Sequence, residues 1–307
     1  MEEGSEGVHR YDPGMVRREG KLHAISRLIR IEHTIFSLPY AYLGALLATK
    51  HLLLREIVLI FLSVLGLRTA AMAYNNIADL PIDRLNPRSS RRPLVSGALT
   101  VKEAWIIVIA GSLIYYISAA LLNWYAFLLS PLLWVIAITY PYAKRIHPLP
   151  HIHLGLTLGL VVFGGTVAAI GDEVRSLTEL AIQIPWGLVI AVTMWVAGFD
   201  ILYSIMDYEF DVKHDLGSIP AWLGINAAKK VAIFFHIVFL ALLLYTIERY
   251  SLGLIAEATF MLTAFLIILQ HYIVAREGLK GIPVAFNINL VIGLIVGLGF
   301  SIDLILG

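Results

Sequence analysis

The chain lacks cysteine entirely, and charged residues make up only 15% of its 307 positions. The absence of cysteine excludes disulfide bonds, thiolate metal ligands and cysteine nucleophiles. Soluble domains carry about 25% charged residues, whereas 59% of the residues here are hydrophobic. The formal net charge of +1 says little about partners, because in a membrane protein the placement of charge matters more than its sum. No nucleic-acid partner is expected. This composition predicts a protein that is solvated by the lipid bilayer.

Apolar runs of membrane-spanning length recur along the whole chain. A helix needs about 20 apolar residues to cross roughly 30 Å of hydrocarbon. We therefore predict an all-α membrane protein, a bundle of nine transmembrane helices that form a single domain over residues 21–307. Residues 1–20 begin acidic and lack the apolar core of a signal peptide, so they are predicted to form a polar N-terminal tail. The nine predicted spans are residues 31–49, 56–80, 103–122, 124–141, 152–171, 182–206, 228–247, 251–274 and 283–306.

The distribution of Lys and Arg supports nine crossings and predicts their orientation. If the N-terminus lies inside, 18 of the 23 Lys and Arg residues belong to inside segments and 4 to outside connectors. The remaining one, Arg68, lies within a predicted span. An excess of positive charge is typical of cytoplasmic loops. We therefore expect a cytoplasmic N-terminus, two cytoplasmic loops at 81–102 and 207–227, and a C-terminus on the opposite side.

Two aspartate motifs stand at the ends of the second and sixth predicted spans, as NNIADLPID and YSIMDYEFD. Their polar residues recur every four positions, which places each set on one stripe of a helix. Corresponding residues are 128 positions apart, which indicates two four-helix halves at about 26–150 and 151–275, followed by a ninth helix at 283–306. The stripes consist of Asn75, Asp79 and Asp83 in the first half and of Tyr203, Asp207 and Asp211 in the second.

The chemistry of these stripes points to a bound cation and phosphate. Carboxylates at the edge of a bilayer are costly unless they are paired, hydrated or bound to a cation. Mg²⁺ is commonly held by one or two carboxylates together with phosphate oxygens of a substrate. A single motif is more often a helix cap or a solvated loop, but two matched motifs favour a binding site. Pro81 leaves open whether Asp79 and Asp83 share one unbroken helix. Basic residues predicted on the same side are Arg88, Arg91, Arg92, Lys144, Arg145 and Lys213.

Three histidines and two glycines around the start of the fifth span have a more ordinary interpretation. His147, His151 and His153 have loop spacing and no nearby carboxylate, which predicts surface residues and no metal site. Gly155 and Gly159 predict close packing of the fifth helix against a neighbour.

Arg68 stands seven residues before Asn75, and therefore about 10 Å deeper along the same helix. An arginine at that depth needs a partner that faces the bundle interior. Two interpretations stay open. One is a structural ion pair, for example with Asp200. The other is a two-pronged hydrogen bond to a carboxylate of a substrate, a geometry that suits arginine better than lysine.

The motifs resemble those of the UbiA superfamily of intramembrane prenyltransferases, which read NDxxDxxxD and YxxxDxxxD. The segment NPRSSRRPLVSG (86–97) is similar to the R-P-L-x-S-G loop of that family, and YPYAKR (140–145) is similar to its Y-x-x-x-K-R element. The resemblance covers nearly the whole chain. One departure is Asn76, where the family pattern has aspartate. An amide oxygen can coordinate a cation but adds no charge.

The resemblance implies a central cavity with a lateral opening for a prenyl tail, and two Mg²⁺ ions that bridge the diphosphate of a prenyl substrate. It implies a catalytic tyrosine at Tyr203, one turn deeper than the second acid pair. Asp200 is expected either to line the wall of the site or to bind the acceptor by a hydrogen bond. The metal ligands implied by the resemblance are Asn75, Asp79, Asp83, Asp207 and Asp211.

The implied reaction moves an isoprenoid chain from its diphosphate to an aromatic acceptor. An allylic cation would form in a water-poor cavity and be attacked by an electron-rich ring. A 4-hydroxybenzoate-like quinone precursor is the expected acceptor, and glycerol-ether lipid, haem and naphthoate acceptors are alternatives. From other classes, a secondary transporter with paired intramembrane acids and a non-catalytic isoprenoid-binding scaffold stay open. No obligate protein partner is expected.

Overall fold

The computed structural model describes residues 20–49 and 51–307, with side chains for all of these except 31–35. Apart from Gly20, the predicted polar tail lies outside the described residues. Every regular element in the described part of the chain is a helix, and each of the nine predicted spans overlaps one long helix. They are α2 (Ile31–Ala48), α3 (Leu54–Asp83), α4 (Val101–Leu122), α5 (Trp124–Ile146), α6 (Pro150–Ile170), α8 (Trp186–Ser204), α11 (Ile225–Arg249), α12 (Leu254–Glu277) and α13 (Ile282–Leu306).

Short helices connect or cap the long ones. The short α-helices are α1 (Lys21–Ile29), α7 (Leu177–Gln183), α9 (Tyr208–Lys213) and α10 (Ile219–Leu223). Single 3₁₀ turns form η2 (Pro87–Ser89), η3 (Ile205–Asp207) and η4 (Gly278–Gly281). Where a connector is short, as at Asn123 between α4 and α5, the two helices form a tight hairpin.

Seven stretches of the described chain are long and apolar enough to cross a membrane. The last of them, Leu254–Leu306, contains both α12 and α13. In α2 the apolar stretch Phe36–Ala48 is shorter. The prediction of an all-α membrane bundle is confirmed, whereas the number of nine crossings and the division into two four-helix halves stay predictions.

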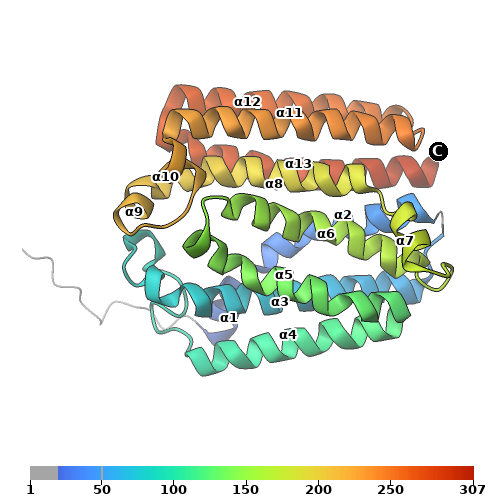
Figure 1. Ribbon diagram of the computed structural model, residues 1–307, viewed down its shortest axis with the longest axis horizontal. Coiled ribbons are helices and arrows are strands. Elements are labelled where there is room, and N and C mark those ends of the chain that lie inside the picture. Colours follow the sequence, from blue (N-terminus) through green and yellow to red (C-terminus); the bar gives the residue numbers. More distant parts are fainter. Residues whose placement is uncertain (1–19, 50) are drawn as a thin grey trace, which may run out of the picture.

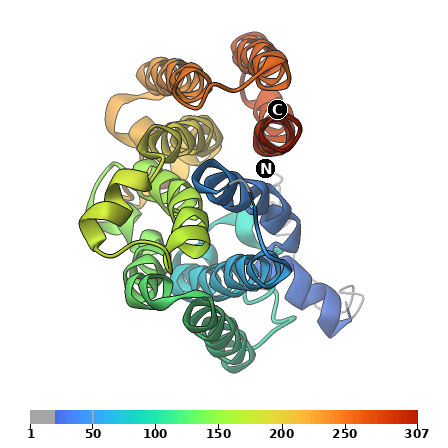
Figure 2. The same cartoon turned by 90° about the vertical axis from the view of Figure 1, so that its right-hand side faces the viewer.

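The long helices run side by side along the length of the molecule (Figure 1). The helix α3 packs against α4, and α6 packs against both α2 and α8. The helix α11 contacts α8, α12 contacts α13, and α13 also contacts α2. Figure 2 shows this arrangement from one end, with α13 beside α2.

Small residues let α6 approach its neighbours closely, as predicted from Gly155 and Gly159. A Cβ atom at Gly155 would lie 2.3 Å from the carbonyl oxygen of Thr193 in α8. One at Gly159 would lie 2.3 Å from the hydroxyl of the same threonine. Backbone-to-backbone packing of this kind replaces the hydrophobic effect as the source of helix association in lipid.

The two long polar connectors lie at the same end of the bundle. Residues 84–100 gather there with α9 and α10, whereas α7 and the C-terminus lie at the opposite end (Figure 1). This placement agrees with the predicted common side for both aspartate motifs. Which end faces the cytoplasm stays a prediction.

Candidate active site

The first aspartate motif lies on one unbroken helix. The helix α3 continues through Pro81 to Asp83, and the N–H of Arg84 still donates to the carbonyl of Leu80 at 3.2 Å. Proline removes only its own donor, and the turn beyond it remains helical. Asp79 and Asp83 are therefore one turn apart on the same stripe, and each is only 4% exposed.

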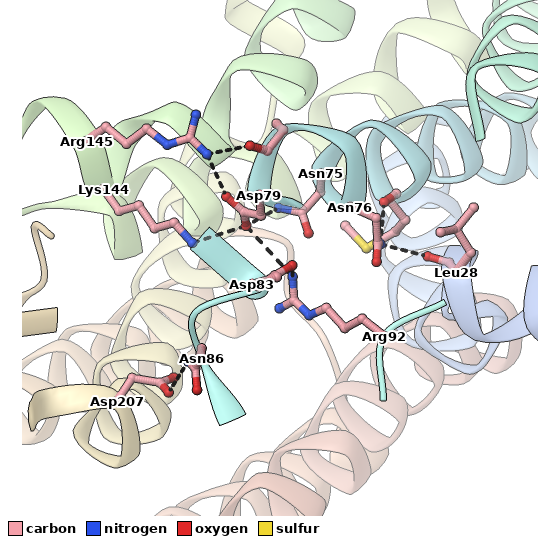
Figure 3. Close-up of polar contacts among 12 residues, drawn as sticks. Leu28, Asn75, Asn76, Asp79, Asp83, Asn86, Arg92, Lys144, Arg145 and Asp207 are labelled. Atoms are coloured by element: carbon pink, nitrogen blue, oxygen red, sulfur yellow. Dashed lines mark hydrogen bonds and ion pairs between the residues drawn. The ribbon is translucent and has the colours of Figure 1, made fainter. Parts of the chain in front are cut away.

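Asp79 is surrounded by cationic and amide groups (Figure 3). Its carboxylate accepts from Lys144 Nζ at 3.1 Å and from Arg145 Nη2 at 3.3 Å. The Asn75 amide donates to the same carboxylate at 3.1 Å. Both cations come from the last turn of α5. The structure therefore brings the K-R pair of the Y-x-x-x-K-R element into contact with the first motif.

The connector after α3 folds back over the acids. The guanidinium of Arg92 forms an ion pair with Asp83 and lies 3.9 Å from Asp79. The hydroxyls of Tyr74 and Tyr142 are 2.8 Å apart, which links α3 to α5 close to these pairs. The first motif is thus held within a set of cations from two elements.

The second motif does not form the predicted helical stripe. The helix α8 ends at Ser204, the chain tightens into the 3₁₀ turn η3, and Asp211 follows on the separate helix α9. With about three residues per turn in a 3₁₀ helix, residues four apart no longer share one face. The expectation that Tyr203, Asp207 and Asp211 continue one helix was therefore wrong.

Asp207 is nevertheless brought to the first motif by the connector after α3. The guanidinium of Arg88 lies 2.5 Å from its carboxylate, and the amide of Asn86 donates to it at 3.3 Å. The same guanidinium stands 5.6 Å from the ring centre of Tyr203. Asn86, whose contact with Asp207 sequence reasoning missed, links the second motif to the connector that follows the first (Figure 3).

His151 corrects a second expectation, because it is 2% exposed and not a surface residue. It is the second residue of α6, and its Nδ1 lies 2.6 Å from the Asp200 carboxylate. Asp200 therefore has His151 as a partner, which the sequence did not suggest, and the ion pair with Arg68 stays a prediction. Spacing along the chain carries no signal for this pair, since 49 positions separate the two residues.

Other predicted residues lie farther out or deeper. The side chains of Arg91 and Lys213 are exposed, and Arg91 contributes its carbonyl as an acceptor for Arg27. Arg68 lines an apolar cavity enclosed by α2, α3, α4, α5 and α6. The ring centre of Tyr203 lies 5.0 Å from that of Phe286 in α13.

The donor set fits magnesium only together with a substrate. Among the described side chains, which exclude those of residues 31–35, no three His, Asp or Glu residues are placed to hold one ion by themselves. The acids form pairs, as suits an ion that takes one or two carboxylates and completes its shell with phosphate oxygens and water. The number of ions stays a prediction.

Comparisons with known proteins agree with this geometry. The sequence model of the UbiA prenyltransferase family matches residues 37–291. The apo structure of a UbiA homologue from Aeropyrum pernix K1 has a TM-score of 0.85 and 55% identity, covering 89% of this chain and 98% of that one. A UbiA homologue from Archaeoglobus fulgidus bound to GPP and Mg²⁺ shares the fold, with a TM-score of 0.70 and 24% identity over 92% of this chain and 100% of its own.

A sequence relative extends these comparisons. The 4-hydroxybenzoate octaprenyltransferase of Francisella tularensis subsp. mediasiatica is 27% identical over 288 residues. The match covers 90% of this chain and 95% of the relative.

Proposed function

The chain belongs to the UbiA prenyltransferase family and is a prenyltransferase, and we propose that it transfers an isoprenoid chain from a magnesium-bound prenyl diphosphate to an aromatic acceptor within the bilayer. The observation that carries the proposal is the cluster around Asp79. Buried carboxylates and a ring of cations from α5 and the 84–100 connector meet there, and Asn86 ties the second motif to them.

Charge balance supports a magnesium diphosphate as the ligand of this cluster. The ligand carries charges of both signs, so carboxylates that now pair with cations would turn to the metal while the cations turn to phosphoryl oxygens. No buried charge is left unpartnered by this exchange, which matters because an isolated one is costly. Bound there, Mg²⁺ would neutralise the leaving diphosphate as the allylic C–O bond breaks. The proposed phosphate-binding residues are Arg88, Arg92, Lys144 and Arg145, opposite Asp79, Asp83, Asp207 and Asp211.

The acceptor side of the proposal rests on Asp200 and Arg68. Asp200 is a carboxylate held by His151, and it is suited to accept a hydrogen bond from a phenol. Arg68 stands at the wall of an apolar cavity and is suited to hold a carboxylate at the other end of a benzoate ring. The apolar lining would keep water from an allylic cation. The relative that is a 4-hydroxybenzoate octaprenyltransferase supports this acceptor class.

The test uses purified protein in lipid nanodiscs with labelled geranyl diphosphate and Mg²⁺. Acceptors are 4-hydroxybenzoate, phenol, a dihydroxynaphthoate and a glycerol-phosphate ether lipid. We expect a prenylated product with 4-hydroxybenzoate that disappears when the metal is chelated. Undiminished turnover in chelator would contradict the proposed dependence on Mg²⁺. Transfer only to the ether lipid would contradict the proposed aromatic acceptor.

A further inference from the structure

Asn76 occupies the position where the family pattern has aspartate, and it does not face the acids of its own helix. Its side chain turns toward α1, away from Asp79 and Asp83 (Figure 3). The amide Nδ2 donates to the carbonyl of Leu28 at 3.3 Å and to that of Met72 at 2.9 Å. The residue is 8% exposed. Both partners are acceptors, so this site needs a donor.

The identity of the partner explains why an amide stands here. Leu28 lies in the last turn of α1, two residues before Arg30, which takes a left-handed conformation with φ of 46°. The last carbonyls of a helix lack partners within that helix, and the helix dipole gives its C-terminal end a partial negative charge. A carboxylate at position 76 would face two carbonyl oxygens and this dipole. An amide satisfies both carbonyls without charge.

The helix α1 in turn holds the connector that carries the phosphate-binding arginines. The guanidinium of Arg27 donates to the carbonyl of Arg91, and Arg92, the next residue, pairs with Asp83 and reaches Asp79. Apolar contacts reinforce this tie. The buried cluster contains Ala24 and Leu28 of α1, Ala73 and Leu80 of α3, and Leu94 and Leu99 of the connector.

We propose that Asn76 is a positioning residue that fastens α1 to α3, so that α1 holds the segment around Arg92 over the diphosphate site. On this inference Asn76 is not a metal ligand, although it stands inside the metal-binding motif. The inference rests on the proposed function for its catalytic consequence, but the fastening itself is a property of the protein without substrate.

The decisive variant is Asn76→Asp, which restores the family residue. If position 76 binds the metal, the new carboxylate should lower the Mg²⁺ concentration needed for half-maximal turnover. If Asn76 is a positioning residue, the substitution should leave that concentration unchanged. It should then raise the KM for geranyl diphosphate by about fivefold, the effect of losing one ordinary hydrogen bond. The uncharged variant Asn76→Leu removes the donor without adding charge, and it should change KM in the same direction.

A second tie allows a coupling test. Arg27→Ala should also raise the KM for geranyl diphosphate, and its effect should be less than multiplicative with that of Asn76→Asp, because both act through α1. Lys21→Ala is the matched control within the same helix. Lys21 pairs with Glu103 at 2.8 Å at an exposed position, and surface pairs contribute little.

Hydrogen exchange of the substrate-free protein separates this inference from the proposed function. In Asn76→Asp and Asn76→Leu, we expect faster exchange in residues 21–30 and 84–100 than in wild type, with α11 unchanged. Unchanged exchange in both segments, or a lowered Mg²⁺ requirement in Asn76→Asp, would overturn the positioning role. If wild type showed no turnover at all, the exchange result would still decide whether Asn76 fastens α1.

Discussion

The buried His151 and the half-buried Asp200 form a pair in which the position of the proton follows from the geometry. His151 Nε2 accepts a hydrogen bond from the backbone N–H of Ile219 at 3.2 Å. A backbone N–H can only donate, so Nε2 carries no hydrogen, and the proton of the neutral ring sits on Nδ1. That proton is donated to the Asp200 carboxylate 2.6 Å away. The histidine therefore orients the acid of α8 from α6.

Removing this hydrogen-bond donor should weaken the use of the acceptor substrate and leave the use of the prenyl diphosphate unchanged. In His151→Leu we expect kcat/KM for 4-hydroxybenzoate to fall by about tenfold, the effect of losing a hydrogen bond to a charged group, with the KM for geranyl diphosphate unchanged. In His151→Asn, whose amide nitrogen can take the place of Nδ1, part of the activity should return. His153→Leu is the control on the same helix, since His153 bonds instead to the carbonyl of Ile136 at 3.0 Å. Equal losses for both substrates would contradict the assignment.

Asp79→Asn should reduce turnover by about 100-fold or more while the protein still folds, because it removes a charge at the developing diphosphate and keeps the side-chain volume. The fold should survive since Lys144 and Arg145 keep 27% and 29% side-chain exposure and can turn to water. Steady-state transfer rates and thermal unfolding in detergent measure the two effects. Asp172→Asn, in an exposed turn at the other end of the bundle, should match wild type in both. Retention of half the activity by Asp79→Asn would refute the site.

Arg68→Lys should raise the KM for 4-hydroxybenzoate by about tenfold, since lysine cannot make the two-pronged bond to a carboxylate. The KM for geranyl diphosphate should not change, and neither should the KM for an acceptor that lacks a carboxylate. Arg55→Lys serves as the control on the same helix, because Arg55 bonds to the carbonyl of Leu121 near the opposite end of α3. A loss shared equally by both substrates, or failure to fold, would favour a structural role for Arg68.

Gly155→Ala should destabilise the protein by about 1–3 kcal/mol, because its Cβ would lie 2.3 Å from the Thr193 carbonyl and force α6 away from α8. Gly164→Ala offers a matched comparison on the same helix. Its Cβ would meet only a leucine side chain of α5, Leu133, at 3.6 Å, an ordinary contact. Thermal unfolding in detergent should show a lower midpoint for the first variant alone. Equal midpoints would argue against close α6–α8 packing.

Single-cysteine labelling can test the predicted orientation, and the cysteine-free chain gives no background. Ser90→Cys and Glu209→Cys lie in exposed positions at the site end, whereas Glu173→Cys lies in an exposed turn at the α7 end. In sealed vesicles of known orientation, an impermeant reagent should label the first two from the cytoplasmic side and the third from the other. Labelling of Ser90→Cys and Glu209→Cys from opposite sides would rule out a shared site.

The helices and the first half of the site could be predicted from the sequence because local rules govern them. Lipid solvation requires every spanning backbone to be helical and apolar over a known length, so the predicted spans and the long helices coincide. Asp79 and Asp83 share a stripe because four residues make about one helical turn. Lys144 and Arg145 were predicted on the same side as the motifs from the order of the spans, and the resemblance to the R-P-L-x-S-G loop drew attention to Arg92.

Tertiary structure alone decided the features that depend on contacts between distant elements. The 3₁₀ turn that breaks the second stripe, the burial of His151 against Asp200, and the turn of Asn76 toward Leu28 have no periodic signal in the sequence. Each partner lies 48 or 49 positions away from the residue it contacts in the last two cases. A buried polar group must find a hydrogen-bond partner, and the packing of α1, α6 and α8 determined which one.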